Sequence, residues 1–71
     1  MKHLILLSDD DEIFCDMKEI NKIIFDYAQN LLDESDIRSN AFKPLEMLTV
    51  IYFNDGGTAT FSTANLEMYF D

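Results

Sequence analysis

The chain has 71 residues, of which 14 are Asp or Glu and five are Lys or Arg, so its formal charge at pH 7 is −9. This length leaves room for one small domain, residues 1–71, and for no second one. Its apolar content of 48% includes six Phe and three Tyr, which excludes an intrinsically disordered acidic tail, because such tails lack the apolar surface that offsets the entropy of ordering.

Cysteine usage and the N-terminal residues indicate the compartment. A single cysteine, Cys15, cannot form an internal disulfide, so a disulfide-stapled secreted domain is excluded. The apolar run at residues 4–7 is too short for the core of a secretion signal, and no run approaches the roughly 18 apolar residues of a membrane span. We therefore expect a cytoplasmic protein that makes no contact with a membrane.

The first half of the chain predicts a short strand followed by a long helix. Residues 4–7 are apolar on both faces, as in a buried strand. Ser8 is suited to cap a helix that begins near Asp9, since acids in a first turn interact favourably with the helix dipole. Residues 9–33 would then form one amphipathic helix of roughly 37 Å. Its apolar stripe recurs at spacings of three and four: Ile13, Met17, Ile20, Ile24, Tyr27, Ala28 and Leu31.

A connecting loop is predicted at residues 34–44. This segment has no hydrophobic period, and Pro44 disfavours helix at Lys43. Ile37 and Phe42 are the apolar residues that we expect to pack from this loop onto the core, although either could be an exposed contact.

Strands are predicted for the second half. Residues 46–53 are rich in β-branched and aromatic side chains, which is typical of a central strand covered on both faces. Residues 54–57, Asn-Asp-Gly-Gly, predict a hairpin turn, and residues 58–62 alternate like the returning strand. Residues 65–70 also alternate and favour a strand, although Thr63 or Asn65 could instead cap one helical turn.

Together these elements predict an α+β fold of order β-α-β-β, ending in a strand or a short helix. A small single-layer sheet of three or four strands would pack on the one long amphipathic helix. The first two strands would be parallel if adjacent, and the third would be antiparallel to the second. Because one helix covers one face, the other sheet face would need the loop, the tail or a second subunit.

The predicted helix gathers acids on one ridge. Neighbours three or four residues apart would lie about 5–6 Å apart, comparable with successive phosphates of a nucleic acid, so the ridge would fit a site built for a polyanion. The alternative is an ordinary solvated face. Ile23 lies among the acids and Phe25 borders the buried stripe, so each is a candidate apolar anchor. The acidic members are Glu12, Asp16, Glu19, Asp26 and Asp33.

Other kinds of site lack their signatures. The run at residues 9–12 lacks the glycine and the distal Glu of a calcium loop. His3 and Cys15 alone offer too few ligands for zinc. No nucleophile motif or glycine-rich phosphate loop is present. Five basic residues are too few for direct nucleic-acid binding. We therefore expect no enzyme, no cofactor and no metal.

The remaining hypothesis is an acidic interaction module. Its charge would attract a basic groove and speed association, so we expect an inhibitor that mimics nucleic acid and blocks the basic groove of a nucleic-acid-processing protein. In size and charge the chain is similar to small phage-encoded inhibitors, such as anti-CRISPR proteins and uracil-DNA glycosylase inhibitors, which would place it in the host cytoplasm. The alternative is a homodimeric or larger structural or adaptor subunit that acts through an apolar sheet face.

Overall fold

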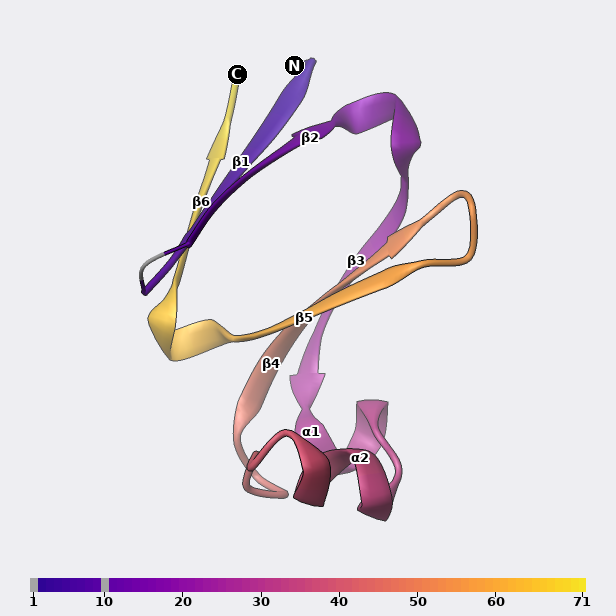
Figure 1. The fold of residues 1–71 in the computed structure, drawn as a ribbon, viewed down its shortest axis with the longest axis vertical. Coiled ribbons are helices and arrows are strands. Elements are labelled where there is room, and N and C mark those ends of the chain that lie inside the picture. The colour runs from indigo at the N-terminus through magenta and orange to yellow at the C-terminus, as the bar shows by residue number, and fades with distance from the viewer. Residues whose placement is uncertain (1, 10) are drawn as a thin grey trace.

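Six strands form two three-stranded antiparallel sheets in the computed structural model, which describes residues 2–9 and 11–71 (Figure 1). One sheet has the order β2-β1-β6 and consists of β1 (His3–Ser8), β2 (Asp11–Asp16) and β6 (Leu66–Phe70). The other has the order β3-β4-β5 and consists of β3 (Ile20–Tyr27), β4 (Met47–Phe53) and β5 (Thr58–Ser62). Four short helical segments connect them: η1 (Met17–Glu19), α1 (Ala28–Leu31), α2 (Glu34–Ser39) and η2 (Thr63–Asn65).

The two sheets are joined at two corners, where the chain leaves one sheet and enters the other. Strand β2 continues through η1 into β3, and β5 continues through η2 into β6 (Figure 1). Bends of this kind let consecutive strands belong to two packed sheets. At the η1 corner, Asn54 donates its backbone N–H to the carbonyl of Glu19 at 2.9 Å and its side-chain amide to the carbonyl of Lys18 at 2.8 Å. The β4-β5 turn therefore fixes the position of this corner.

The main core is built by side chains from both sheets. Its buried members are Leu4 and Leu6 of β1, Cys15 of β2 and Ile51 of β4. Burial of each such aliphatic side chain contributes about 1.5–3 kcal/mol. Partly buried apolar side chains surround them: Met17, Ile20, Ile23, Phe53, Ala59, Phe61, Leu66 and Met68.

A second cluster covers the opposite face of β4. Leu48 and Val50 are buried there together with Ala28 of α1. The partly buried residues around them include Ile37 and Phe42, so the prediction that these two side chains pack onto the core is confirmed. The prediction that residues 46–53 form a strand covered on both faces is confirmed as well.

The α+β fold with a long helix over residues 9–33 is wrong. The protein is mostly β, and the described residues contain two α-helices of only four and six residues. Ser8 ends β1 instead of capping a helix, and the single-layer sheet is replaced by two sheets. The first two predicted strands, which were expected to be parallel if adjacent, are not adjacent, because β1 and β4 lie in different sheets.

The apolar spacing around η1 explains this error. Met17 and Ile20, which are three residues apart in the predicted stripe, pack against the main core together with Ile23, which the helix would have placed among the acids. In an uninterrupted strand, residues three apart face opposite sides. Here η1 and a register shift between Ile20 and Lys22 reset the alternation. Two short strands joined in this way reproduce part of the spacing of a helical stripe, although Ile24 of that stripe is paired with Val50 on the other face of β4.

The other predicted elements divide into confirmed strands and one corrected loop. The strands expected at residues 4–7, 58–62 and 65–70 are β1, β5 and β6, and residues 54–57 do connect β4 to β5 as a hairpin. The loop expected at residues 34–44 instead begins with α2, because the Asp33 carboxylate accepts a hydrogen bond from the Asp36 backbone N–H at 2.9 Å and caps the helix.

Candidate protein-interaction face

The β2-β1-β6 sheet presents ordered rows of side chains on the face turned away from the core. Directly paired residues of antiparallel strands lie side by side, and alternate residues of one strand share a face. Leu4, Leu6 and Cys15 point into the main core, so the residues between them point outward. Ile5 is paired with Phe14 on one side and with Tyr69 on the other. These three residues form the central apolar row.

An acid-ended row lies on each side of the central apolar row. Phe14 is 60% exposed and Tyr69 is 50% exposed, so the central row is open to solvent. The register of the three strands gives the flanking rows as Glu12, Leu7 and Glu67 on one side, and Asp16, His3 and Asp71 on the other. We call these nine residues the outer face.

Side-chain contacts between the rows confirm that these residues share one face. The rings of His3 and Phe14 have centroids 5.0 Å apart, and His3 Nε2 lies 3.3 Å from a carboxylate oxygen of Asp16. The Tyr69 hydroxyl donates a 2.6 Å hydrogen bond to Glu67, and this bond raises the pKa of the tyrosine. The aromatic side chains at both ends of the central row are therefore held by neighbours on the same face.

The outer face is not covered by a helix within the part of the chain that the structure describes. Helices α1 and α2 lie against the other sheet (Figure 1). Near His3, a hollow of about 390 Å³ is lined by Lys2, His3, Asp16, Met17 and Lys18, so lysines offset some of the negative charge at that end. The row of Glu12 lies at the other end, next to the turn between β1 and β2, and the outer face is most acidic there.

The structure does not assemble the predicted ridge, because the helix that would carry it is absent. Glu12 and Asp16 lie in β2 on the outer face, whereas Glu19 belongs to η1. Asp26 lies in β3, and Asp33 caps α2. The acids that a helix would have lined up are thus divided among both sheets and two connections.

Asp26 and Asp33 are engaged in local hydrogen bonds. Asp26 accepts one from Asn30 at 3.0 Å and one from the Tyr27 backbone at 2.7 Å, and these bonds lower its pKa. The Asp33 carboxylate accepts a hydrogen bond from the backbone N–H of Asp36 in the first turn of α2, and this bond lowers the pKa of Asp33. These carboxylates therefore have structural partners within their own segments.

The two predicted apolar anchors have different environments. Ile23 is partly buried and packs against the main core, so its side chain supports the fold. Phe25 is 54% exposed on β3, in the other sheet from the outer face. Seven outer-face residues were not predicted as binding residues: His3, Ile5, Leu7, Phe14, Glu67, Tyr69 and Asp71. Alternation in residues 11–16 and 66–70 is the sequence signal for Phe14, Glu67 and Tyr69, whereas the outward positions of β1 follow from its pairing with β2 and β6.

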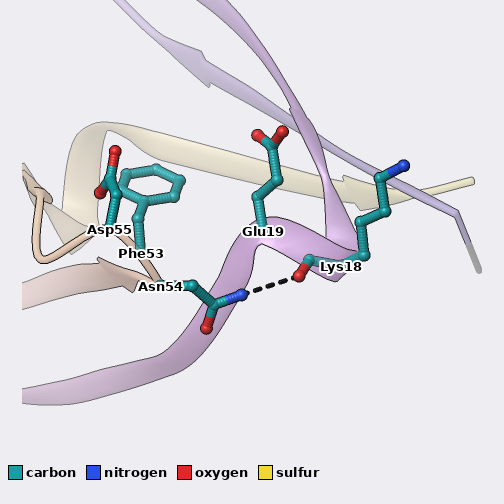
Figure 2. Close-up of a pocket in the computed structure, with 5 residues that line it drawn as sticks. All are labelled: Lys18, Glu19, Phe53, Asn54 and Asp55. Atoms are coloured by element: carbon teal, nitrogen blue, oxygen red, sulfur yellow. Dashed lines mark hydrogen bonds between the residues drawn. The ribbon is translucent and has the colours of Figure 1, made fainter.

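A further hollow of about 460 Å³ lies at the η1 corner, lined by Lys18, Glu19, Phe53, Asn54 and Asp55 (Figure 2). Figure 2 shows the Asn54 amide directed at the carbonyl of Lys18, the contact that holds this corner. The lining residues include no cysteine, serine or histidine. Their arrangement supports the fold and offers no nucleophile with a neighbouring base.

The remaining observations concern other kinds of site. In residues 2–9 and 11–71, no three His, Cys, Asp or Glu side chains are close enough together to hold a metal ion. Asp10, part of the acidic run at residues 9–12, lies outside the described residues. Over the same two ranges no helix is long and apolar enough to cross a membrane. Comparison with protein-family models, curated proteins and solved structures gave no match.

Proposed function

We propose that the protein is an acidic interaction module whose outer face binds a basic surface of another protein. The observation that carries this proposal is the exposed central apolar row between two acid-ended rows. Apolar patches rimmed by charge are typical of protein interfaces. Phe14 and Tyr69 would supply the anchoring contacts, since aromatic residues dominate binding energy, and the acids would select a basic partner.

The partner class that we propose is a protein with a nucleic-acid-binding surface. Such surfaces are basic, because they neutralise phosphates with Lys and Arg. A chain of charge −9 would be drawn to them and would compete with nucleic acid for the same residues. Binding would thus inhibit the partner.

The outer face would compete by charge and apolar contact, without copying the spacing of phosphates. Glu12 and Glu67 flank β1, so they are about 10 Å apart at ordinary strand spacing. Glu12 and Asp16 are four residues apart on one strand, which is about 13 Å. Both separations exceed the 5–6 Å, roughly, between neighbours on a helical ridge.

A homodimer through the outer face is the second candidate, and the central apolar row is the observation in its favour. Charge opposes it. Both copies would present acids at the ends of the same rows, so a two-fold contact brings like charges together. Charges in direct contact are closer than the Debye length of about 8 Å in physiological salt, so screening leaves much of this repulsion.

The test is capture of proteins from a bacterial lysate on the immobilised chain, with three matched samples. Wild type should retain nucleic-acid-binding proteins that duplex DNA displaces and 1 M salt, where the Debye length is about 3 Å, releases. The variant E12Q/E67Q should retain several-fold less. The control E34Q/D36N removes the same charge from α2 and should behave like wild type.

Two results would contradict the proposal. Equal retention by E12Q/E67Q and wild type would remove the outer face from binding. Recovery of only the protein itself, resistant to salt and to DNA, would favour the homodimer, whose mass light scattering would then measure.

A further inference from the structure

Strand β2 lies at the edge of its sheet, and its hydrogen-bonding pattern can be deduced from two neighbouring bonds. The backbone N–H of Met17 donates to the carbonyl of Lys2 at 2.9 Å. His3 instead exchanges backbone hydrogen bonds of 3.1 and 3.0 Å with Asp71 on the opposite side of β1. Along β1, even-numbered residues thus bond to β2 and odd-numbered residues bond to β6.

The same alternation decides which groups of β2 are left at the edge. In an antiparallel pair, residues with mutual hydrogen bonds alternate with residues whose N–H and C=O groups point away from the partner. The register pairs Leu4 with Cys15 and Leu6 with Ile13, so these are the bonded pairs. In the part of the chain that the structure describes, no strand lies on the other side of β2. The groups that point to this open edge are the N–H and C=O of Glu12 and Phe14 and the N–H of Asp16, whose C=O accepts the first hydrogen bond of η1.

The open edge of β2 is accessible on both faces of the sheet. Its first four residues, Asp11 to Phe14, are all exposed. The strand contains no proline and no lysine, two residues with which proteins commonly block pairing at an edge. Its charged side chains are all acids, which protect the edge against acidic strands and leave it a template for a basic one.

We propose that β2 takes up an extended basic segment of the partner as an added antiparallel strand. Backbone hydrogen bonds to Glu12, Phe14 and Asp16 would provide affinity, and cross-strand side-chain pairs would provide specificity. The segment would place a basic residue opposite Asp16, an apolar residue opposite Phe14 and a basic residue opposite Glu12. Each row of the outer face would then gain a fourth, complementary member. This inference rests on the proposed function, because it describes how the basic partner is held.

Charge selects this occupant over a second copy of the chain. If β2 paired antiparallel with another β2 about Phe14, each Glu12 would lie opposite an Asp16. Like charges directly opposite each other destabilise a strand pair. Opposite charges at the same positions stabilise a strand pair. The acids of β2 therefore disfavour pairing with a second β2 and favour pairing with a basic strand.

The probe is a capped heptapeptide, TRTITRT, whose arginines and isoleucine match the three outward positions of β2. Three further peptides serve as comparisons. One carries an N-methyl group on the isoleucine, whose N–H should bond to β2. In the second peptide the N-methyl group is on the threonine that follows the isoleucine, at peptide position 5, whose N–H should point away from β2. The third, TETITET, reverses the charge. Affinity is measured by titration of ¹⁵N-labelled protein, with exchange rates of the Glu12, Phe14 and Asp16 amides.

The expected results separate backbone pairing from simple charge attraction. TRTITRT should slow exchange of these three amides at least about tenfold, since each gains a hydrogen bond. Methylation of the isoleucine should weaken binding at least about tenfold, because it removes one bond and blocks the approach of the strands. Methylation of threonine 5 should change the affinity less than about twofold, and TETITET should not bind.

The outcomes that would overturn the inference leave the proposed function separately testable. Equal binding of both methylated peptides would show contact through side chains alone, and equal binding of TETITET would remove the charge selectivity of the edge. Absence of peptide binding, with capture from lysate still sensitive to E12Q/E67Q, would overturn the added strand and leave the basic partner in place. Absence of peptide binding together with capture that is insensitive to E12Q/E67Q would overturn both the added strand and the proposed function.

Discussion

The hydroxyls of Thr49 and Thr63 lie 2.9 Å apart and connect the centre of β4 to the η2 corner. Thr49 has no exposed surface and is the one buried polar residue among those described. A buried hydroxyl without a partner is unfavourable, so this bond helps to fix where the chain leaves the β3-β4-β5 sheet for the β2-β1-β6 sheet.

Replacement of Thr63 by valine should lower the free energy of unfolding by about 1–3 kcal/mol, because the buried Thr49 hydroxyl then lacks a partner. Thr49→Val should cost less, since Thr63 is partly exposed and can bond to water. The double variant should be no less stable than Thr63→Val alone. Urea unfolding of all three measures this, and wild-type stability in Thr63→Val would show that the bond contributes nothing.

Leu6 and Phe14 lie in paired strands but on opposite faces of the sheet, so truncation should affect them differently. Leu6→Ala opens a cavity in the main core and should cost about 2–5 kcal/mol. Phe14→Ala removes a side chain that is 60% exposed and should cost less than about 1 kcal/mol. Denaturant unfolding compares the two. Equal losses would mean that Phe14 is packed within the fold and is unsuitable as an exposed anchor.

The capping carboxylate of Asp33 gives α2 a dependence on pH. The hydrogen bond from the Asp36 backbone, followed by that from Ser35, holds the pKa of Asp33 below its ordinary value of 3.8. The unfolded chain therefore binds this proton more readily than the folded protein does. The stabilisation is fully present above pH 3.8 and is lost as the pH falls through the lower folded-state pKa.

Two measurements check this prediction. A carboxylate titration followed by ¹³C NMR should give Asp33 a lower pKa than an exposed Asp in an unfolded peptide. The variant Asp33→Ala should be less stable than wild type at pH 7, and this difference should shrink in acid. A difference that stays constant with pH would mean that the ionised carboxylate does not cap α2.

Cys15 should react slowly with thiol reagents in the folded protein. Burial raises the pKa of its thiol, and the neighbouring charges of Glu19 and Asp16 raise it further. Since the thiolate is the reactive form, labelling with iodoacetamide at pH 8 should be much slower in buffer than in 8 M urea. Similar rates in both solutions would place the thiol at the surface instead of in the main core.

Which residues share the outer face depends on whether residues 11–27 form a helix or strands. Residues 12, 16, 19, 26 and 33 share one side of a helix, where each residue advances by about 100°. In strands each residue advances by about 180°, so Glu12 and Asp16 share a face with Phe14 between them. The positions of Ile5 and Tyr69 beside Phe14 depend on the pairing of β1 with β2 and with β6, and β6 is far from both strands in sequence.

Local sequence determined much of the second half of the chain. β-Branched and aromatic residues in residues 46–53, the turn at Asn54 to Gly57 and the alternation of residues 58–62 are features of neighbouring residues, and they correctly indicate β4, the hairpin and β5. The charge of −9 likewise follows from composition.

Tertiary structure decided how residues 11–27 fold. Their apolar spacing fits a helix, but Ile20, Ile23 and Ile24 favour strands, because β-branched side chains lose freedom in a helix and pack well on a pleated sheet. Pairing with β1 and β4 resolves the ambiguity by satisfying backbone groups and burying Cys15 and Ile23 against the same core. A single amphipathic segment does not encode such distant partners, so the two sheets and the outer face emerge only when the whole chain packs.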